Sequence, residues 1–330
     1  MKKFAIIALI LVVAATCAVG FVGCYNPYTD EENDFVISIA QPMEHVALTQ
    51  AREAFQESLQ EKMDAAGKKV YFDYKNANGV VTDLGSIIDY FVSNKTDMIY
   101  AIATDAAQQA AQKTDLDGGT IPVIFNAVTD PTDILADNVT GVSDENPMEE
   151  QVKLMQMLMG GGTDFTVGVL YTTSEKNSEV QKNTIKEICQ DMGIAFAERG
   201  IPDANELQTA LAQLAQEADI VYLPTDNLLA SIADSVHNTN VNNKINVPIV
   251  CGEGGMNDKC GVATLSVDYS YLGRLAADIA FDILVNGKSP SEIAYKTQTE
   301  DLTYSINETV AAAIGFEIPQ AVKDLVSAAE

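Results

Sequence analysis

The sequence predicts an α/β protein with two lobes, each built on a parallel sheet that carries helices on both faces. From residue 35 onward, short β-rich runs alternate with amphipathic helical segments, and the connections are short. The chain has 330 residues, of which about 300 follow an apolar leader, and this exceeds one ordinary hydrophobic core. A repeated strand–helix–strand plan also indicates two similar lobes.

The predicted strands are short runs rich in Val, Ile, Tyr and Phe. They span residues 35–40, 70–74, 98–103, 122–126, 166–171, 195–198, 220–223, 248–251 and 263–267. Helical patterns lie between them, as in residues 47–66, where apolar side chains recur at three- and four-residue spacing. Because a helix separates each strand from the next, the strands of one sheet are expected to run parallel.

Two segments of the chain repeat one plan. Residues 97–105 and 219–226 are each a buried strand that ends in Thr-Asp. Each is followed by a helix and then by a strand that opens with a proline, at Pro122 and Pro248. The repeat places equivalent polar residues at equivalent strand ends in the two lobes.

The N-terminus reads as a lipoprotein-type secretory signal. Lys2 and Lys3 precede an unbroken apolar run over residues 4–19, and Gly23-Cys24 follows before the sequence turns polar. We predict a signal peptide over residues 1–23, a diacylglyceryl group on Cys24, and a tether over residues 24–34. The protein is then exported and held at the outer face of the cell membrane as a lipoprotein. The alternative is an uncleaved membrane anchor, for which the run is nearly long enough.

The composition excludes several classes of partner. The formal net charge is -27, which repels nucleic acid and anionic membrane surfaces. Five cysteines form no disulfide framework and no Cys-x-x-Cys motif, so no metal or redox centre is predicted. Cys251 and Cys260 flank a Gly-rich loop and are either bridged outside the cytoplasm or two free thiols.

Ligands of open parallel sheets bind beyond the carboxyl ends of the strands, beside helix N-termini. The residues that follow the predicted strands are rich in hydroxyls, amides and carboxylates, and these are the candidate ligand-binding residues. They are Gln41, Glu44, His45, Thr104, Asp105, Ala127, Thr129, Asp130, Ser143, Asp144, Asn177, Ser178, Asp226, Asn227, Glu253 and Asp268. Ser, Thr, Asp and Asn are also ordinary helix N-caps, which explains any one of these residues taken alone.

Six ordered motifs carry a resemblance to a known family. They are residues 38–48 (SIAQPMEHVAL), 101–108 (AIATDAAQ), 125–131 (FNAVTDP), 139–144 (VTGVSD), 223–227 (LPTDN) and 267–274 (VDYSYLGR). Together they resemble the ABC-transporter substrate-binding proteins of the tryptophan/tyrosine-binding type, from about residue 35 to the C-terminus. Asp105 departs from the family, whose members commonly carry an uncharged residue there.

The resemblance implies a type I periplasmic-binding-protein fold, with two Rossmann-like lobes joined by a three-crossing hinge. The first lobe would comprise residues 35–145 and about 268–292, and the second residues 146–267 and about 293–330. It further implies an aromatic amino acid, Trp, Tyr or Phe, bound in the cleft and passed to an ABC permease driven by its ATPase.

A catalytic function has little support in the sequence, and no cofactor is expected. The chain has no Gly-x-x-x-x-Gly-Lys loop, no Gly-x-Ser-x-Gly elbow and no His-Glu-x-x-His helix. A sugar- or nucleoside-binding lipoprotein of the same fold is the alternative, although the absence of Trp disfavours a stacked sugar. A sensor that reports its ligand to a membrane partner also remains open.

For a zwitterionic ligand, helix N-termini and hydroxyls would hold the carboxylate, with Thr104, Thr129 and Ser143 as candidates. A carboxylate would pair with the ammonium group, and the candidates are Asp144, Asp226 and Asp268. Three aromatic residues are candidate ring partners: Phe125, Tyr171 and Tyr269.

Overall fold

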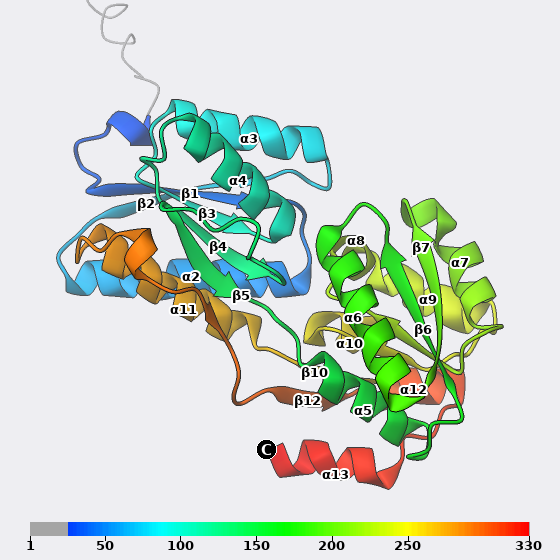
Figure 1. The fold of residues 1–330 in the computed structure, drawn as a ribbon. Coiled ribbons are helices and arrows are strands. Elements are labelled where there is room, and N and C mark those ends of the chain that lie inside the picture. The colour runs from blue at the N-terminus through cyan, green and yellow to red at the C-terminus, as the bar shows by residue number, and fades with distance from the viewer. Residues whose placement is uncertain (1–25, 330) are drawn as a thin grey trace, which may run out of the picture.

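The computed structural model describes residues 26–329, which form two α/β lobes side by side (Figure 1). The predicted signal peptide and Cys24 lie outside the described residues. Each lobe contains a six-stranded sheet. Among the described residues, no helix is both long and apolar enough to cross a bilayer.

The sheet of the first lobe has the strand order β11-β5-β4-β3-β1-β2, and the neighbouring strands of this described part of the chain all pair in parallel. Its strands are β1 (Phe35–Gln41), β2 (Val70–Asn76), β3 (Met98–Ile102), β4 (Val123–Val128), β5 (Val139–Ser143) and β11 (Lys296–Thr297). The strands β1, β3, β4 and β5 are buried on both faces, apart from the first residue of β1. This explains why they read as continuous apolar runs.

The sheet of the second lobe has the order β12-β10-β9-β8-β6-β7. Its strands are β6 (Thr166–Thr172), β7 (Ala195–Ile201), β8 (Ile220–Leu223), β9 (Ile249–Cys251), β10 (Ala263–Ser266) and β12 (Thr303–Ile306). Among the described residues, one strand pairing of this sheet is antiparallel, that of β12 with β10, and the others are parallel. The repeated segments correspond to β3 and β8, which occupy the same place in the two strand orders, so the structure confirms the internal repeat.

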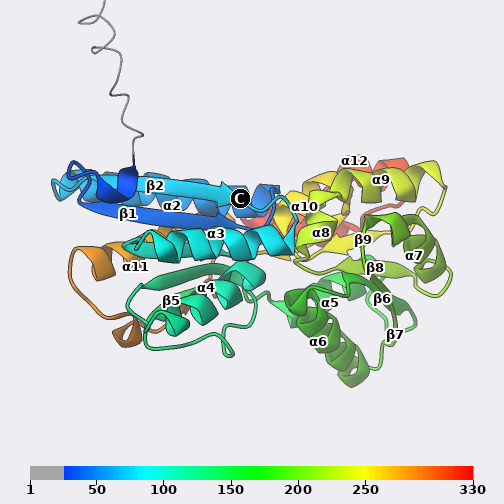
Figure 2. The same cartoon turned by 90° about the horizontal axis from the view of Figure 1, so that it is seen from above.

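Helices cover both faces of each sheet, and each face has its own apolar cluster. In the first lobe, α2 (Val46–Ala65) and α11 (Tyr269–Leu284) pack on one face, and α3 (Val81–Ser93) and α4 (Thr104–Leu116) on the other. In the second lobe, one face carries α5 (Met148–Leu158), α6 (Lys176–Met192), α12 (Glu308–Ile314) and α13 (Gln320–Ala329). The other carries α7 (Leu207–Leu214), α8 (Asn227–Ser231), α9 (Ala233–Asn242) and α10 (Gly254–Cys260). Figure 2 shows these layers from above.

The chain crosses between the lobes three times, after β5, after β10 and after β11. We expected residues from about 293 onward to belong to the second lobe. However, β11 pairs with β5 in the first sheet, so the last crossing lies between Thr297 and Thr303. The sequence did not predict β5, β11 or β12, because β5 is rich in small and polar residues and β11 has only two residues.

Candidate functional site

The carboxyl ends of the two sheets face each other, and the loops that follow the strands enclose a small cavity. Its lining residues come from both lobes: His45, Leu48, Ala127, Asp144, Asn177, Thr225, Asp226, Asn227, Ala230, Glu253 and Tyr269. The cavity leaves about 10 Å³ for water, roughly one molecule. The lobes are therefore closed around the site.

Direct contacts between the lobes surround the cavity. His45 precedes α2 in the first lobe, and its Nε2 lies 3.2 Å from Oδ1 of Asn227 in the second. Gln181 of α6 donates from Nε2 to Oγ1 of Thr129, which follows β4, at 3.2 Å. These contacts exist only while the lobes are closed, so they stabilise the closed arrangement selectively.

Three carboxylates line the cavity, and none of its lining residues is Lys or Arg. Asp144, Asp226 and Glu253 are 3%, 1% and 3% exposed. Burial raises the pKa of all three carboxyl groups, that of Glu253 to about 7, and the nearby charges of Asp258 and Asp144 add to the rise at Glu253. A cation in the cavity would relieve both the burial cost and the repulsion.

Asp226 is engaged by the protein itself. Its Oδ2 accepts from Thr172 N at 2.7 Å and from Ser178 Oγ at 2.8 Å. Its Oδ1 accepts from Thr172 Oγ1 at 2.8 Å and from Leu229 N at 2.9 Å. These four bonds use the acceptor capacity of a carboxylate. Asp226 is therefore a helix N-cap, which is the alternative that the sequence offered for such residues. It connects the start of α8 to the end of β6.

Asp144 and Glu253 keep acceptor positions free for a further donor. Asp144 accepts from Tyr269 Oη at 2.7 Å and from Thr129 Oγ1 at 3.2 Å. Glu253 caps α10 by accepting from two backbone N–H groups at 2.7 Å. Since a carboxylate offers about four acceptor sites, each can still receive an ammonium N–H.

Glu175 belongs to the same acidic group but was not predicted. It is 7% exposed and accepts from the backbone N–H of Asn227 and Leu228, both at 2.8 Å. Burial, and then the charge of Asp226, raises its pKa. It follows β6 in the same polar cluster as Asn177, so its position was visible in the sequence, but its burial was not.

The first lobe presents buried polar atoms that have no partner within the described protein. Three of them lie at or just after the carboxyl ends of the neighbouring strands β1 and β3: Oε1 of Gln41, Nδ1 of His45 and Oγ1 of Thr104. Burial lowers the pKa of His45 to about 4, so its ring is neutral at pH 7. An unpaired buried polar group costs about 1–3 kcal/mol, and a bound molecule that pairs with these atoms would recover that cost.

Residues 36–330 match the family of ABC transporter substrate binding proteins. The chain belongs to this family. It is 32% identical over 300 residues to the tyrosine-binding protein of Clostridioides difficile strain R20291, covering 88% of this chain and 84% of that one. The structure of an ABC domain from Streptococcus pneumoniae in complex with L-Trp is 28% identical, with a TM-score of 0.78 over 87% of this chain and 98% of that one.

A further comparison bears on the closed arrangement of this binding protein. The ligand-free, open structure of an adhesive substrate-binding protein from Clostridium difficile is 33% identical and covers 86% of this chain and 96% of that one. Its TM-score is only 0.64, below that of the less identical complex with L-Trp. The better fit to the ligand-bound relative agrees with closed lobes in this binding protein.

Several predicted residues support the site of this binding protein without lining its cavity. Thr129 and Ser178 hydrogen-bond to the carboxylates of Asp144 and Asp226. Ser143 accepts from the amide of Glu145 and donates weakly to a carbonyl at 3.4 Å. Thr129 and Ser178 therefore position acidic side chains, and Ser143 holds the backbone beside them.

Other predicted residues lie outside the cavity. Asp130 is exposed and accepts from the backbone and hydroxyl of Thr132. Asp268 caps α11 through Ser270 N at 2.8 Å and lies 3.5 Å from Arg274. Asp105 is half-buried in the first turn of α4, where burial raises its pKa. The structure therefore does not place Asp268 at the cavity as an ammonium partner.

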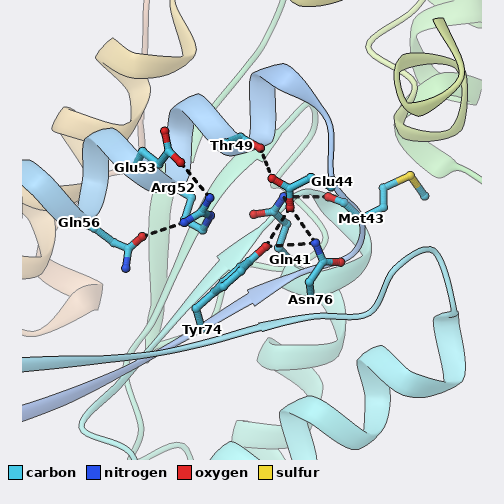
Figure 3. A network of polar contacts seen from close by, with 9 residues as sticks. All are labelled: Gln41, Met43, Glu44, Thr49, Arg52, Glu53, Gln56, Tyr74 and Asn76. Carbon is cyan, nitrogen blue, oxygen red and sulfur yellow. Dashed lines mark hydrogen bonds and ion pairs between the residues drawn. The ribbon is translucent and has the colours of Figure 1, made fainter. Parts of the chain in front are cut away.

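Glu44 is turned towards the outer strand β2, as Figure 3 shows. It accepts from Tyr74 Oη at 3.1 Å and from Asn76 Nδ2 at 2.9 Å, and it also binds Thr49 and Gln41. This network fixes the loop between β1 and α2, which carries His45. Glu44 is thus held at the mouth of the site rather than inside it.

Of the three candidate ring partners, only Tyr269 lines the cavity. Phe125 is fully buried in the apolar cluster beneath α3 and α4. The ring of Tyr171 lies under Lys182, whose Nζ is 5.2 Å from the ring centre. Position along the chain explains the difference. Phe125 and Tyr171 lie within β4 and β6 and point to the faces of the sheets, whereas Tyr269 begins α11 beyond the carboxyl end of β10.

Cys251 and Cys260 are both buried free thiols, with their Sγ atoms 4.0 Å apart. The structure therefore shows the alternative of two free thiols rather than a bridge. Over residues 26–329, no group of three or more His, Cys, Asp or Glu side chains is arranged to hold a metal ion.

Proposed function

We propose that this substrate-binding protein captures an aromatic amino acid outside the cell and delivers it to an ABC permease and its ATPase. The observation that carries the proposal is the set of buried carboxylates that line the cavity without a Lys or Arg among them. This site favours a ligand with a positive charge. The tyrosine-binding and Trp-bound relatives support an aromatic amino acid in particular.

The ammonium group of the ligand is placed between Asp144 and Glu253, because these two carboxylates keep free acceptor positions. Each charge-assisted hydrogen bond contributes about 1.5–3 kcal/mol net. A micromolar ligand needs about 8 kcal/mol, so a few such bonds supply much of the affinity.

The carboxylate of the ligand is placed at the first lobe, where Thr104 Oγ1 is buried without a partner at the N-terminus of α4. The helix dipole and the first amides of α4 attract an anion there. Tyr269, Leu48 and two alanines, Ala127 and Ala230, provide the apolar walls for the ring.

Closure couples binding to delivery. An amino acid does not fit a space for about one water, so the lobes have to separate to admit it. A ligand that contacts both lobes then stabilises the closed form, and the permease recognises closed lobes. An ion pair between Asp133 of the first lobe and Lys176 of the second adds to the closed form.

A binding panel tests this function. Isothermal titration of the chain without its signal peptide is expected to detect Trp, Tyr or Phe and to show a matching rise in melting temperature. Sugars and nucleosides are the competing classes in the panel. Binding of a sugar or nucleoside with no response to the three amino acids would contradict the proposal.

We also propose that the protein is a lipoprotein anchored through Cys24, on the basis of the apolar run that ends in Gly23-Cys24. Cys24→Ala is expected to abolish incorporation of radiolabelled fatty acid and to release the protein from membranes. A variant that still incorporates lipid would rule out this anchor.

A further inference from the structure

The N-terminal segment (residues 26–34) was expected to be a featureless tether, but it is folded against the first lobe. It contains a short helix, η1 (Pro27–Thr29), capped by the side chain of Asn26. At its other end, the carboxylate of Asp34 accepts from the amide of Lys69 at 2.9 Å and pairs with Lys68 at 3.0 Å. The segment thus has defined contacts at both ends.

Tyr28 is the residue that docks the segment. Its hydroxyl donates to Asp73 and lies 2.9 Å from Ser38 Oγ. Ser38 and Asp73 are register partners on β1 and β2, so both contacts fall at one place on the sheet. The half-buried ring of Tyr28 also packs edge-on against Tyr90 of α3, with 6.0 Å between ring centres.

Ser38 and Asp73 are the middle residues of β1 and β2, so Tyr28 docks on the outer edge of the first lobe, beside β2 and α3. The carboxyl ends of the strands, where the cavity residues follow, lie towards the second lobe. Three residues, about 10 Å of strand, separate Ser38 from the carboxyl end of β1 at Gln41.

We infer that Tyr28 is a clip that holds the outer edge of the first lobe, formed by β2 and α3, against the lipid bilayer. The inference rests on the proposed anchor at Cys24. With Tyr28 docked, four Cα–Cα steps join it to Cys24, and they reach at most about 14 Å. If the whole segment were released up to Phe35, eleven residues would reach about 38 Å.

The bilayer is what contacts the surface around Tyr28, because the chain leaves the lobe there and the segment between Tyr28 and Cys24 is short. The clip therefore sets the orientation of the lobe and limits how far the cleft moves from the membrane. Release of the clip lengthens the tether almost threefold in extended reach. Docking of Tyr28 then controls how easily the binding protein reaches its membrane partner.

The first experiment tests the clip without any lipid. Hydrogen exchange of the chain without signal peptide is expected to show protected amides at Tyr28, Thr29, Asn33 and Asp34, and Tyr28→Ala should abolish the protection. Tyr28→Phe, which keeps the ring against Tyr90 but loses the hydroxyl contacts, should give an intermediate rate. Tyr271→Ala removes another exposed tyrosine of the same lobe and should change nothing. Equal exchange in Tyr28→Ala and the parent would overturn the clip.

The second experiment measures orientation on lipidated protein in phosphatidylcholine vesicles that carry headgroup acceptors. The chain has no Trp, so Ser93→Trp at the exposed end of α3 and Gln213→Trp on α7 of the second lobe are clean single donors. Energy transfer from position 93 should be strong and should fall about twofold or more when Tyr28→Ala is added, because the flexible tether lengthens. Transfer from position 213 should be weak with the clip intact.

The outcomes separate the inference from its premise. Failure of the purified protein to join vesicles would overturn the lipid anchor and the membrane-facing surface with it, whereas the exchange experiment would still report the clip. Vesicle binding with equal transfer from positions 93 and 213, or with no response to Tyr28→Ala, would overturn the inference alone.

Discussion

Asp144→Asn is expected to weaken amino acid binding by about 30-fold or more, because it leaves the buried ligand ammonium without a charged partner. The new amide keeps both existing contacts, since its oxygen accepts from Tyr269 and its nitrogen donates to Thr129. Burial raises the pKa of Asp144, so loss of the charge removes a cost to the unliganded fold. The melting temperature without ligand should therefore stay the same or rise.

Two matched substitutions complete this experiment. Asp268→Asn makes the same change in net charge at an exposed carboxylate outside the cavity and should leave the affinity unchanged. Asp226→Asn should lower the melting temperature, because the carboxylate that accepts four protein hydrogen bonds is lost. Titration calorimetry and thermal melts on the three variants decide the question. Full affinity in Asp144→Asn, or an equal loss in Asp268→Asn, would contradict the assignment.

The fold was largely predictable because buried parallel strands leave a strong apolar signal. All nine predicted strands are present, with ends shifted by at most three residues. The strands that escaped prediction are the ones that local sequence does not determine. β5 has Gly141 where an added Cβ would lie 2.1 Å from the carbonyl oxygen of Phe125, so packing selects its small residues. β11 and β12 form only because the hinge brings them to the sheets.

The site was predictable as a location but not as a set of contacts. Asp226 and Glu253 follow predicted strands, Asp144 ends the segment that leads out of the first lobe, and all three line the cavity. However, the same residue types also cap helices. Only the structure shows that the carboxylate of Asp226 accepts four hydrogen bonds from the protein, whereas that of Asp144 accepts two. The direction of a side chain is equally invisible in one sequence. Glu44 and His45 are adjacent, yet one turns to β2 and the other to the cavity.

The affinity for a zwitterionic amino acid is expected to rise between pH 6 and pH 8, while the stability of the unliganded protein falls between pH 6.5 and pH 8. In the free protein, burial raises the pKa of Glu253 to about 7, and the pKa of Asp144 is also raised. Below these pKa values, binding of an ammonium group has to expel a proton. Each proton expelled lowers the affinity by up to about tenfold per pH unit.

The stability trend has the opposite sign because the folded protein binds more protons than the unfolded chain. Glu253 ionises near 4.5 when unfolded and near 7 when folded, so its contribution is complete below the lower value and is lost as the pH passes the higher one. Glu175, whose pKa is also raised, acts in the same direction. His45 acts oppositely, but only between its folded value of about 4 and its unfolded value of 6.5. Above pH 6.5 the carboxyl groups therefore decide the slope, which reaches about 1.4 kcal/mol per pH unit for each proton.

Calorimetric titrations at pH 6 and pH 8 in buffers of different ionisation enthalpy measure the proton release directly, and melts from pH 6.5 to pH 8 measure the slope. Glu253→Gln is the informative variant, since it removes the group whose pKa lies near 7 and should flatten both trends. Asp130→Asn, at an exposed carboxylate outside the cavity whose pKa is lowered, is the matched control and should leave both trends intact. Affinity that is independent of pH with no proton released would mean that the ammonium meets no buried carboxylate in this cleft, and the placement between Asp144 and Glu253 would be wrong.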